Sequence, residues 1–169
     1  DRFIARTIDK ESKHMQEMIT ESYNHKGTSF LEIYQNCNIF NDGAFSNFTD
    51  RDTKSDTVLW LKDGEPMVFG ADNNTGIRLD GNIPTVVELG DKWNKDDLLV
   101  HNKKDYMIAS MLSNMTSKPD TPEPIGVLYA IDAPTYEDNI ASQISSAVKN
   151  KPKSSIQDII NAGDTWVVK

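Results

Sequence analysis

The sequence contains a single cysteine, Cys37, among its 169 residues. One cysteine cannot form an internal disulfide or complete a metal site, and such sparing use of cysteine is typical of the reducing cytosol. No apolar run approaches the roughly 20 residues of a membrane-spanning helix, and no charged-then-apolar leader opens the sequence. We therefore expect a cytoplasmic protein that does not enter a membrane.

Basic charge is also scarce. Eighteen lysines and arginines stand against 26 acidic residues, which gives a formal net charge of -8 at pH 7. A surface of this sign repels phosphate groups, which argues against nucleic acid and anionic membranes as partners. The length and the 37% hydrophobic content are ordinary for a soluble globular protein of one domain, with or without an appendage.

Familiar catalytic motifs are missing as well. The sequence has no Gly-x-x-x-x-Gly-Lys run, no Gly-x-Gly-x-x-Gly run and no Gly-x-Ser-x-Gly elbow. His14, His25 and His101 lie far apart and lack the spacing of metal sites. We expect His14 to be solvated and His25 to lie in the last turn of a helix, where the helix dipole favours a cation.

The first third of the sequence carries a strand–helix–strand pattern. The segment at 3–6, apolar apart from Arg6, predicts a strand, and helical spacing follows until Gly27. The nearly unbroken apolar run at 28–34 predicts a strand buried on both faces of a parallel sheet. Ligands of such sheets gather beyond the carboxyl ends of the strands, which is where Cys37 lies.

A polar stretch with its own aromatic residues follows at 38–56. Its length indicates a shaped functional loop, and the alternative is a connector whose phenylalanines attach it to the body. Beyond it, Asp63-Gly64 predicts a hairpin between strands at 57–61 and 67–69. A second hairpin is predicted around Asp80-Gly81-Asn82. Together these strands would form a small antiparallel meander.

The remainder of the sequence predicts mainly helices. Asp105–Met115 carries methionines at helical spacing, which usually fill a core. A strand at 125–131 follows, and then a helix with Ile140, Ile144 and Val148 on one side. A short helix at 156–160 and an apolar tail at 166–168 complete the pattern, and we expect the tail to dock.

Taken alone, Cys37 is either a small buried apolar side chain or part of a site completed by residues outside this chain. The segment from His25 to Phe45 decides between them, because it closely resembles the thiamine-diphosphate-binding β subunit of 2-oxoacid:ferredoxin oxidoreductases. It is more similar to 2-oxoglutarate-type members than to the pyruvate type, in which a proline tends to follow the cysteine. Looser matches follow the family's order at 2–6, 99–101, 124–127 and 133–136.

The resemblance implies an α/β fold that corresponds to the C-terminal portion of a β subunit of this family. Residues 1–37 would be the last βαβ unit of a thiamine-diphosphate-binding parallel-sheet domain. Residues 38–56 would be a loop near an iron–sulfur cluster. Residues 57–169 would form a C-terminal extension typical of these β subunits, with the small appended antiparallel meander and the C-terminal helices.

The resemblance also implies an activity. In this family a 2-oxoacid is oxidatively decarboxylated on thiamine diphosphate and Mg²⁺, coenzyme A accepts the acyl group, and a 4Fe-4S cluster passes electrons to ferredoxin. The position that matches Cys37 supplies the fourth cysteine ligand of that cluster, a role that fits a thiolate on a loop at a strand end. Asn36 and Asn38 would then donate hydrogen bonds to cluster sulfurs.

The sequence departs from the family pattern because the other three cluster cysteines are absent, as is the Gly-Asp-Gly-Asp-like motif that holds Mg²⁺ and diphosphate. We therefore expect no catalytic residue here and no binding of thiamine diphosphate or a complete cluster by this chain alone. The partners would be the N-terminal half of the β subunit and an α subunit or domain. The alternative is a stand-alone interaction or scaffold domain without redox activity.

Overall fold

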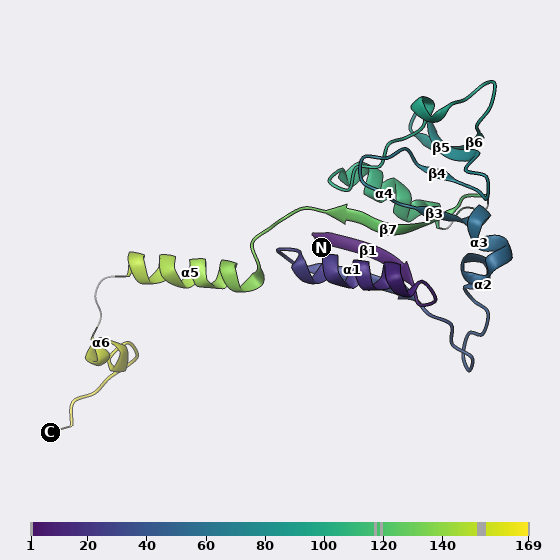
Figure 1. The fold of residues 1–169 in the computed structure, drawn as a ribbon. Helices are drawn as coiled ribbons and strands as arrows, with labels where there is room; N and C mark the ends of the chain where they lie inside the picture. Colours follow the sequence, from purple (N-terminus) through teal and green to yellow (C-terminus); the bar gives the residue numbers. More distant parts are fainter. Residues whose placement is uncertain (1, 117, 119, 152–154, 169) are drawn as a thin grey trace. The chain divides into compact units, whose positions relative to one another are not determined.

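The computed structural model describes residues 2–116, 118, 120–151 and 155–168 (Figure 1). The chain forms two compact units: the first ends at Ala133 and the second begins at Pro134. The first unit contains both sheets and the loop that carries Cys37, while the second contains two helices. None of the helices among the described residues is long and apolar enough to cross a membrane.

The predicted βαβ unit is confirmed. Strand β1 (Phe3–Ile8) leads into helix α1 (Ser12–Asn24) and strand β2 (Ser29–Tyr34), and β1 and β2 pair in parallel along their whole length. The helix packs on the sheet through Met18, which joins a buried cluster with Phe3, Ala5 and Val127. The carboxyl ends of β1 and β2 therefore meet at one edge, from which the Cys37 loop departs.

The larger sheet is mixed, with the strand order β2-β1-β7-β3. Strand β7 (Glu123–Ala130) runs antiparallel to β1, and β3 (Val58–Trp60) runs parallel to β7. The hairpin predicted at Asp63-Gly64 is therefore wrong, since β3 pairs with β7. The Gly64 N–H donates instead to the carbonyl of His101, so the turn folds onto a distant segment.

Strand β2 is less buried than its sequence predicts. It lies at one end of the strand order, and the side chains of Phe30 and Ile33 are 52% and 42% exposed. The expectation of burial on both faces is wrong for this chain because no strand among the described residues pairs with the outer edge of β2.

The smaller sheet confirms the predicted antiparallel meander in part. It comprises β4 (Val68–Phe69), β5 (Thr75–Asp80) and β6 (Ile83–Glu88), and Gly81 adopts the positive φ of 61° at the predicted β5–β6 turn. A 3-10 turn at Lys95–Asp97 follows. The meander does not stand apart, because its Ile77 shares one core cluster with Leu59 of β3.

Helix α4 (Tyr106–Met115) begins at its N-cap Asp105, whose side chain accepts hydrogen bonds from two backbone N–H groups. It packs on β7, and Figure 1 shows α1 and α4 on opposite sides of β1 and β7. Leu112 and Met115 are fully buried in the core. Met107 is largely exposed, so the expectation that methionines at this spacing usually fill a core does not hold for that residue.

The second unit contains α5 (Tyr136–Asn150) and α6 (Ile156–Ile160), which confirms both predicted helices. Thr135 and Asp138 form a capping box at the start of α5, which fixes where the helix begins. The apolar tail at 166–168 is exposed. Its predicted docking is therefore not seen within the described residues.

Gly126 in β7 provides a test of the central sheet. Its φ is +128°, and a Cβ added there would lie 3.0 Å from both the Cβ and the carbonyl oxygen of Leu61. We expect Gly126→Ala to lower the free energy of unfolding by about 1–3 kcal/mol through backbone strain, measured by urea titration. Gly90→Ala is the control, because a Cβ there meets open space, and equal effects of the two substitutions would contradict the prediction.

Candidate functional site

Cys37 lies in a tight turn just beyond β2. The backbone N–H of Asn41 donates to the carbonyl of Cys37 at 3.0 Å and closes the turn. The backbone N–H groups of Phe40, then Ile39, then Asn41 lower the pKa of Cys37. The side chain is partly exposed, so the interpretation of Cys37 as a buried apolar group is wrong. The turn favours a thiolate, which is the form that binds metals.

Asn36 holds this turn closed. Its side-chain amide donates to Oδ1 of Asn38 at 2.7 Å and to Oδ1 of Asp42 at 2.9 Å. Its own Oδ1 accepts the backbone N–H of Gly43 at 2.8 Å. The structure therefore brings both predicted asparagines beside Cys37 and engages both of them in hydrogen bonds within the loop.

Aromatic stacking attaches the following segment to the sheet. Helices α2 (Ser46–Thr49) and α3 (Arg51–Thr57) form within the stretch predicted as a loop. Phe45 stacks on Tyr34 with ring centroids 4.4 Å apart and an interplanar angle of 11°, and Phe48 lies 6.3 Å from the same ring. The predicted anchoring by phenylalanines is thus confirmed for these two.

A buried polar cluster lies beneath these aromatic rings. Glu123 is only 2% exposed, and its Oε1 accepts hydrogen bonds from Arg6, from the Tyr34 hydroxyl at 2.9 Å and from the Thr116 hydroxyl at 3.0 Å. Arg6 also donates to Glu32 at 2.7 Å. Burial raises the pKa of Tyr34 and outweighs the opposing effect of Arg6. The hydroxyl therefore stays protonated and donates to the carboxylate.

This polar cluster has no obvious signal in the sequence. Arg6 lies within β1 and Glu123 begins β7, 117 residues apart in the sequence. A charged residue within an apolar strand, such as Arg6 or Glu32, is the one local hint that a partner must exist. The identity of the partner depends on the pairing of β1 with β7.

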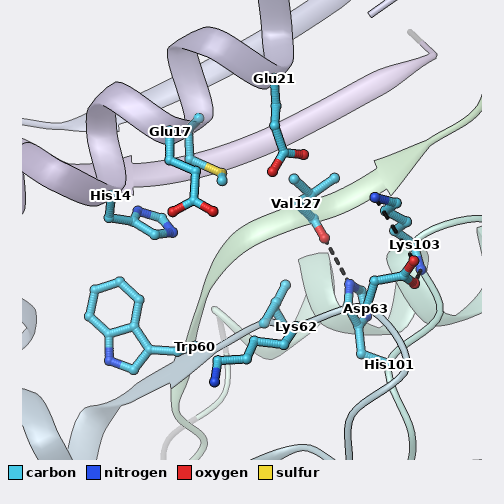
Figure 2. Close-up of a pocket in the computed structure, with 11 residues that line it drawn as sticks. His14, Glu17, Glu21, Trp60, Lys62, Asp63, His101, Lys103 and Val127 are labelled. Atoms are coloured by element: carbon cyan, nitrogen blue, oxygen red, sulfur yellow. Dashed lines mark hydrogen bonds and ion pairs between the residues drawn. The ribbon is translucent and has the colours of Figure 1, made fainter.

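A separate cleft of about 410 Å³ lies between α1 and the segment after β3 (Figure 2). Glu17 and Glu21 extend from α1 on one wall, opposite Lys62 and Asp63. Lys103 lies 3.9 Å from Asp63, measured from Nζ to Oδ2. The two glutamates of α1 therefore face a wall that carries Lys62 and the Lys103–Asp63 pair.

The structure places His14 in this cleft and not in open solvent, so the predicted solvation is wrong. Its Nδ1 lies 2.8 Å from the hydroxyl of Thr7, and its ring meets the edge of Trp60 at 5.0 Å. Burial lowers the pKa of His14 despite the opposing effect of Glu17. This histidine therefore serves as a packed, hydrogen-bonded side chain.

The other two histidines are also structural. Nε2 of His101 lies 2.8 Å from the carbonyl of Val127, while its buried Nδ1 has no hydrogen-bond partner among the described residues. His25 is the C-cap of α1, one residue beyond the helical turn predicted for it, and joins Ser29 to the carbonyl of Ile131. Among the described residues, no group of three or more His, Cys, Asp or Glu side chains could hold a metal ion.

His101 predicts a pH dependence of stability. Burial lowers its pKa from the ordinary value of 6.5, so the unfolded state takes up the proton first as the pH falls. The contribution of His101 to the free energy of unfolding is therefore fully present above about pH 6.5 and decreases as the pH falls below it. We expect His101→Gln to show a smaller drop in unfolding free energy between about pH 7 and about pH 5, measured by urea titration. An identical drop in both proteins would contradict this.

Comparison with known proteins gives one informative relative by sequence, although no family model matches the chain. The chain is 29% identical over 170 residues to 2-oxoglutarate oxidoreductase subunit KorB of Mycobacterium tuberculosis. The match covers 98% of this chain and 45% of the relative. The chain therefore spans less than half the length of that relative.

A solved structure shares the fold. It is 2-oxoglutarate:ferredoxin oxidoreductase from Magnetococcus marinus with 2-oxoglutarate, coenzyme A and succinyl-CoA bound, with a TM-score of 0.55 and 18% identity. The similarity covers 96% of this chain and 40% of that one. These findings confirm the resemblance inferred from the segment around Cys37: the chain is similar, almost end to end, to a portion of a 2-oxoglutarate oxidoreductase subunit.

Proposed function

We propose that this chain is the C-terminal part of the β subunit of a 2-oxoglutarate:ferredoxin oxidoreductase and supplies the fourth cysteine ligand of its 4Fe-4S cluster through Cys37. The observation that carries the proposal is the partly exposed thiol of Cys37 in a turn that Asn41 and Asn36 close, just beyond the carboxyl end of a parallel strand pair. Similarity to KorB along 98% of the chain supports the choice of enzyme. The reaction would be oxidative decarboxylation to an acyl-CoA.

The geometry of Cys37 suits a cluster ligand. Binding iron requires a thiolate, and the N–H groups of Phe40, Ile39 and Asn41 lower the pKa of Cys37. Hydrogen bonds to a coordinated sulfur raise the reduction potential of a cluster. When bound, the cluster would accept electrons from the 2-oxoacid and deliver them to ferredoxin. This chain would contribute one ligand and the local hydrogen bonds.

Asn36 would act on the cluster through the loop. Its amide donates to Asn38 and Asp42, so its main role would be to fix the turn that orients Cys37. Hydrogen bonding from Asn36 or Asn38 to cluster sulfurs stays a prediction. It would require these amides to exchange partners when the cluster binds.

The other components would come from outside this chain. One thiolate cannot hold a 4Fe-4S cluster, and the described residues offer no group of carboxylates that would bind Mg²⁺. The N-terminal half of the β subunit would supply the other three cysteines and hold thiamine diphosphate, and an α subunit or domain would complete the enzyme. In this proposal 38–56 is the cluster-proximal loop and 57–169 the extension.

Cys37→Ser in the complete enzyme tests the assignment. We expect iron per complex to fall and the electron paramagnetic resonance signal of the cluster to be lost or altered, because serine replaces a thiolate ligand, while thiamine diphosphate stays bound. Ser46→Ala, at the start of α2 beyond the turn, is the control. Unchanged iron content and electron-transfer rate in Cys37→Ser would reject the ligand role and favour the scaffold alternative.

The turn can also be tested in the present chain through the reactivity of Cys37. We expect iodoacetamide to alkylate Cys37 with a pH midpoint below that of the urea-unfolded chain, because backbone N–H groups stabilise the thiolate. Asn36→Ala should move the midpoint upward, whereas Asn161→Ala at the end of α6 should not. Equal midpoints in the folded and unfolded chain would contradict the proposed role of the turn.

A further inference from the structure

The Cys37 turn carries two large apolar side chains that the described residues leave uncovered. Ile39 is 84% exposed and Phe40 is 90% exposed, although the flanking residues are polar. Phe45 and Phe48, from the same stretch, pack on Tyr34. The loop thus divides its apolar residues into two anchors and an exposed pair, Ile39 and Phe40, which we call the tip. Rigid exposed apolar groups commonly mark interaction surfaces.

The exposure of the tip belongs to a well-held turn. Asn41 closes it through the Cys37 carbonyl, and Asn36 joins Asn38, Asp42 and the backbone of residue 43. These hydrogen bonds lie on either side of the tip. The apolar pair is therefore held at a defined position, which lowers the entropic cost of binding a partner.

The position of the tip indicates what it contacts. Ile39 and Phe40 lie between Cys37 and Asn41 in the turn that the Asn41 N–H closes on the Cys37 carbonyl, so any group that the sulfur ligates lies next to the tip. The outer edge of β2, which precedes the turn, has no partner strand among the described residues. Exposed Phe30 and Ile33 extend the apolar character along this edge.

We infer that the tip is an interface against the polypeptide segment that carries the remaining cluster ligands, and that it excludes water from the cluster. The inference rests on the proposed function. Two facts favour this occupant over a second copy of the chain. The chain spans 45% of its longer relative, and a second copy would bring only one more cysteine, because the chain has a single one.

Phe40→Ser in the complete enzyme is the test. The side chain is almost fully exposed, so the substitution leaves the fold of the chain intact. We expect the visible absorbance of the cluster to decay about fivefold or more faster in air than in wild type, because water and oxygen reach the cluster. Ile83→Ser, at another exposed apolar position beside the β5–β6 turn, should decay at the wild-type rate. Equal decay of Phe40→Ser and Ile83→Ser would overturn the inference.

Hydroxyl-radical footprinting of the complete wild-type enzyme separates failure of the inference from failure of the proposed function. Protection of Phe40 relative to the urea-unfolded enzyme is expected. If Cys37→Ser loses iron while Phe40 reacts as fast as in the unfolded protein, the interface is wrong and the ligand role stands. If Cys37→Ser keeps its iron, the ligand role of Cys37 is wrong. The proposed contact of the tip with the segment that carries the other cluster ligands is then rejected as well, even if Phe40 is protected.

Discussion

The buried carboxylate of Glu123 is the constraint on which the first unit depends. A carboxylate that is 2% exposed is tolerated only when charge and hydrogen bonds compensate for lost hydration. Here Arg6 supplies the charge, and the hydroxyls of Tyr34 and Thr116 supply hydrogen bonds. Leaving such a group unpaired costs about 3–5 kcal/mol, which is a large fraction of the stability of an ordinary domain. The interaction therefore fixes β1, β2 and β7 together at one edge of the sheet.

The same cluster determines where the Cys37 turn lies. Tyr34 ends β2 and donates its hydroxyl to Glu123, and its ring stacks on Phe45 beyond the turn. One residue thus connects the interior of the sheet to both ends of the loop. Asn36 then closes the loop internally. The turn that carries Cys37 is therefore held in place by contacts of Tyr34 with the core and by Asn36 within the loop, even though Cys37 itself is partly exposed.

Sequence patterns predicted the parts of the fold that depend on residues close together in the chain. The βαβ unit and the turn at Gly81 follow from periodicity and from turn residues that favour a positive φ. The partner of β3 could not be predicted, because Asp63-Gly64 looks the same whether it joins a hairpin or folds onto His101. Burial of β2 depends on neighbours that its own sequence does not specify. The Arg6–Glu123 pair likewise required the pairing of β1 with β7.

The candidate site likewise has features that the sequence predicts and features that depend on the folded structure. The residues around Cys37 carry the resemblance and point to this side chain, whereas the effect of the backbone N–H groups on its pKa depends on the backbone geometry of the turn. On the proposed assignment, a cluster held partly by this chain would join it to the segment that carries the other ligands. The free energy of cluster binding would then stabilise the assembled subunit and neither part alone. Because the turn is already closed by Asn36, little ordering would remain to oppose binding.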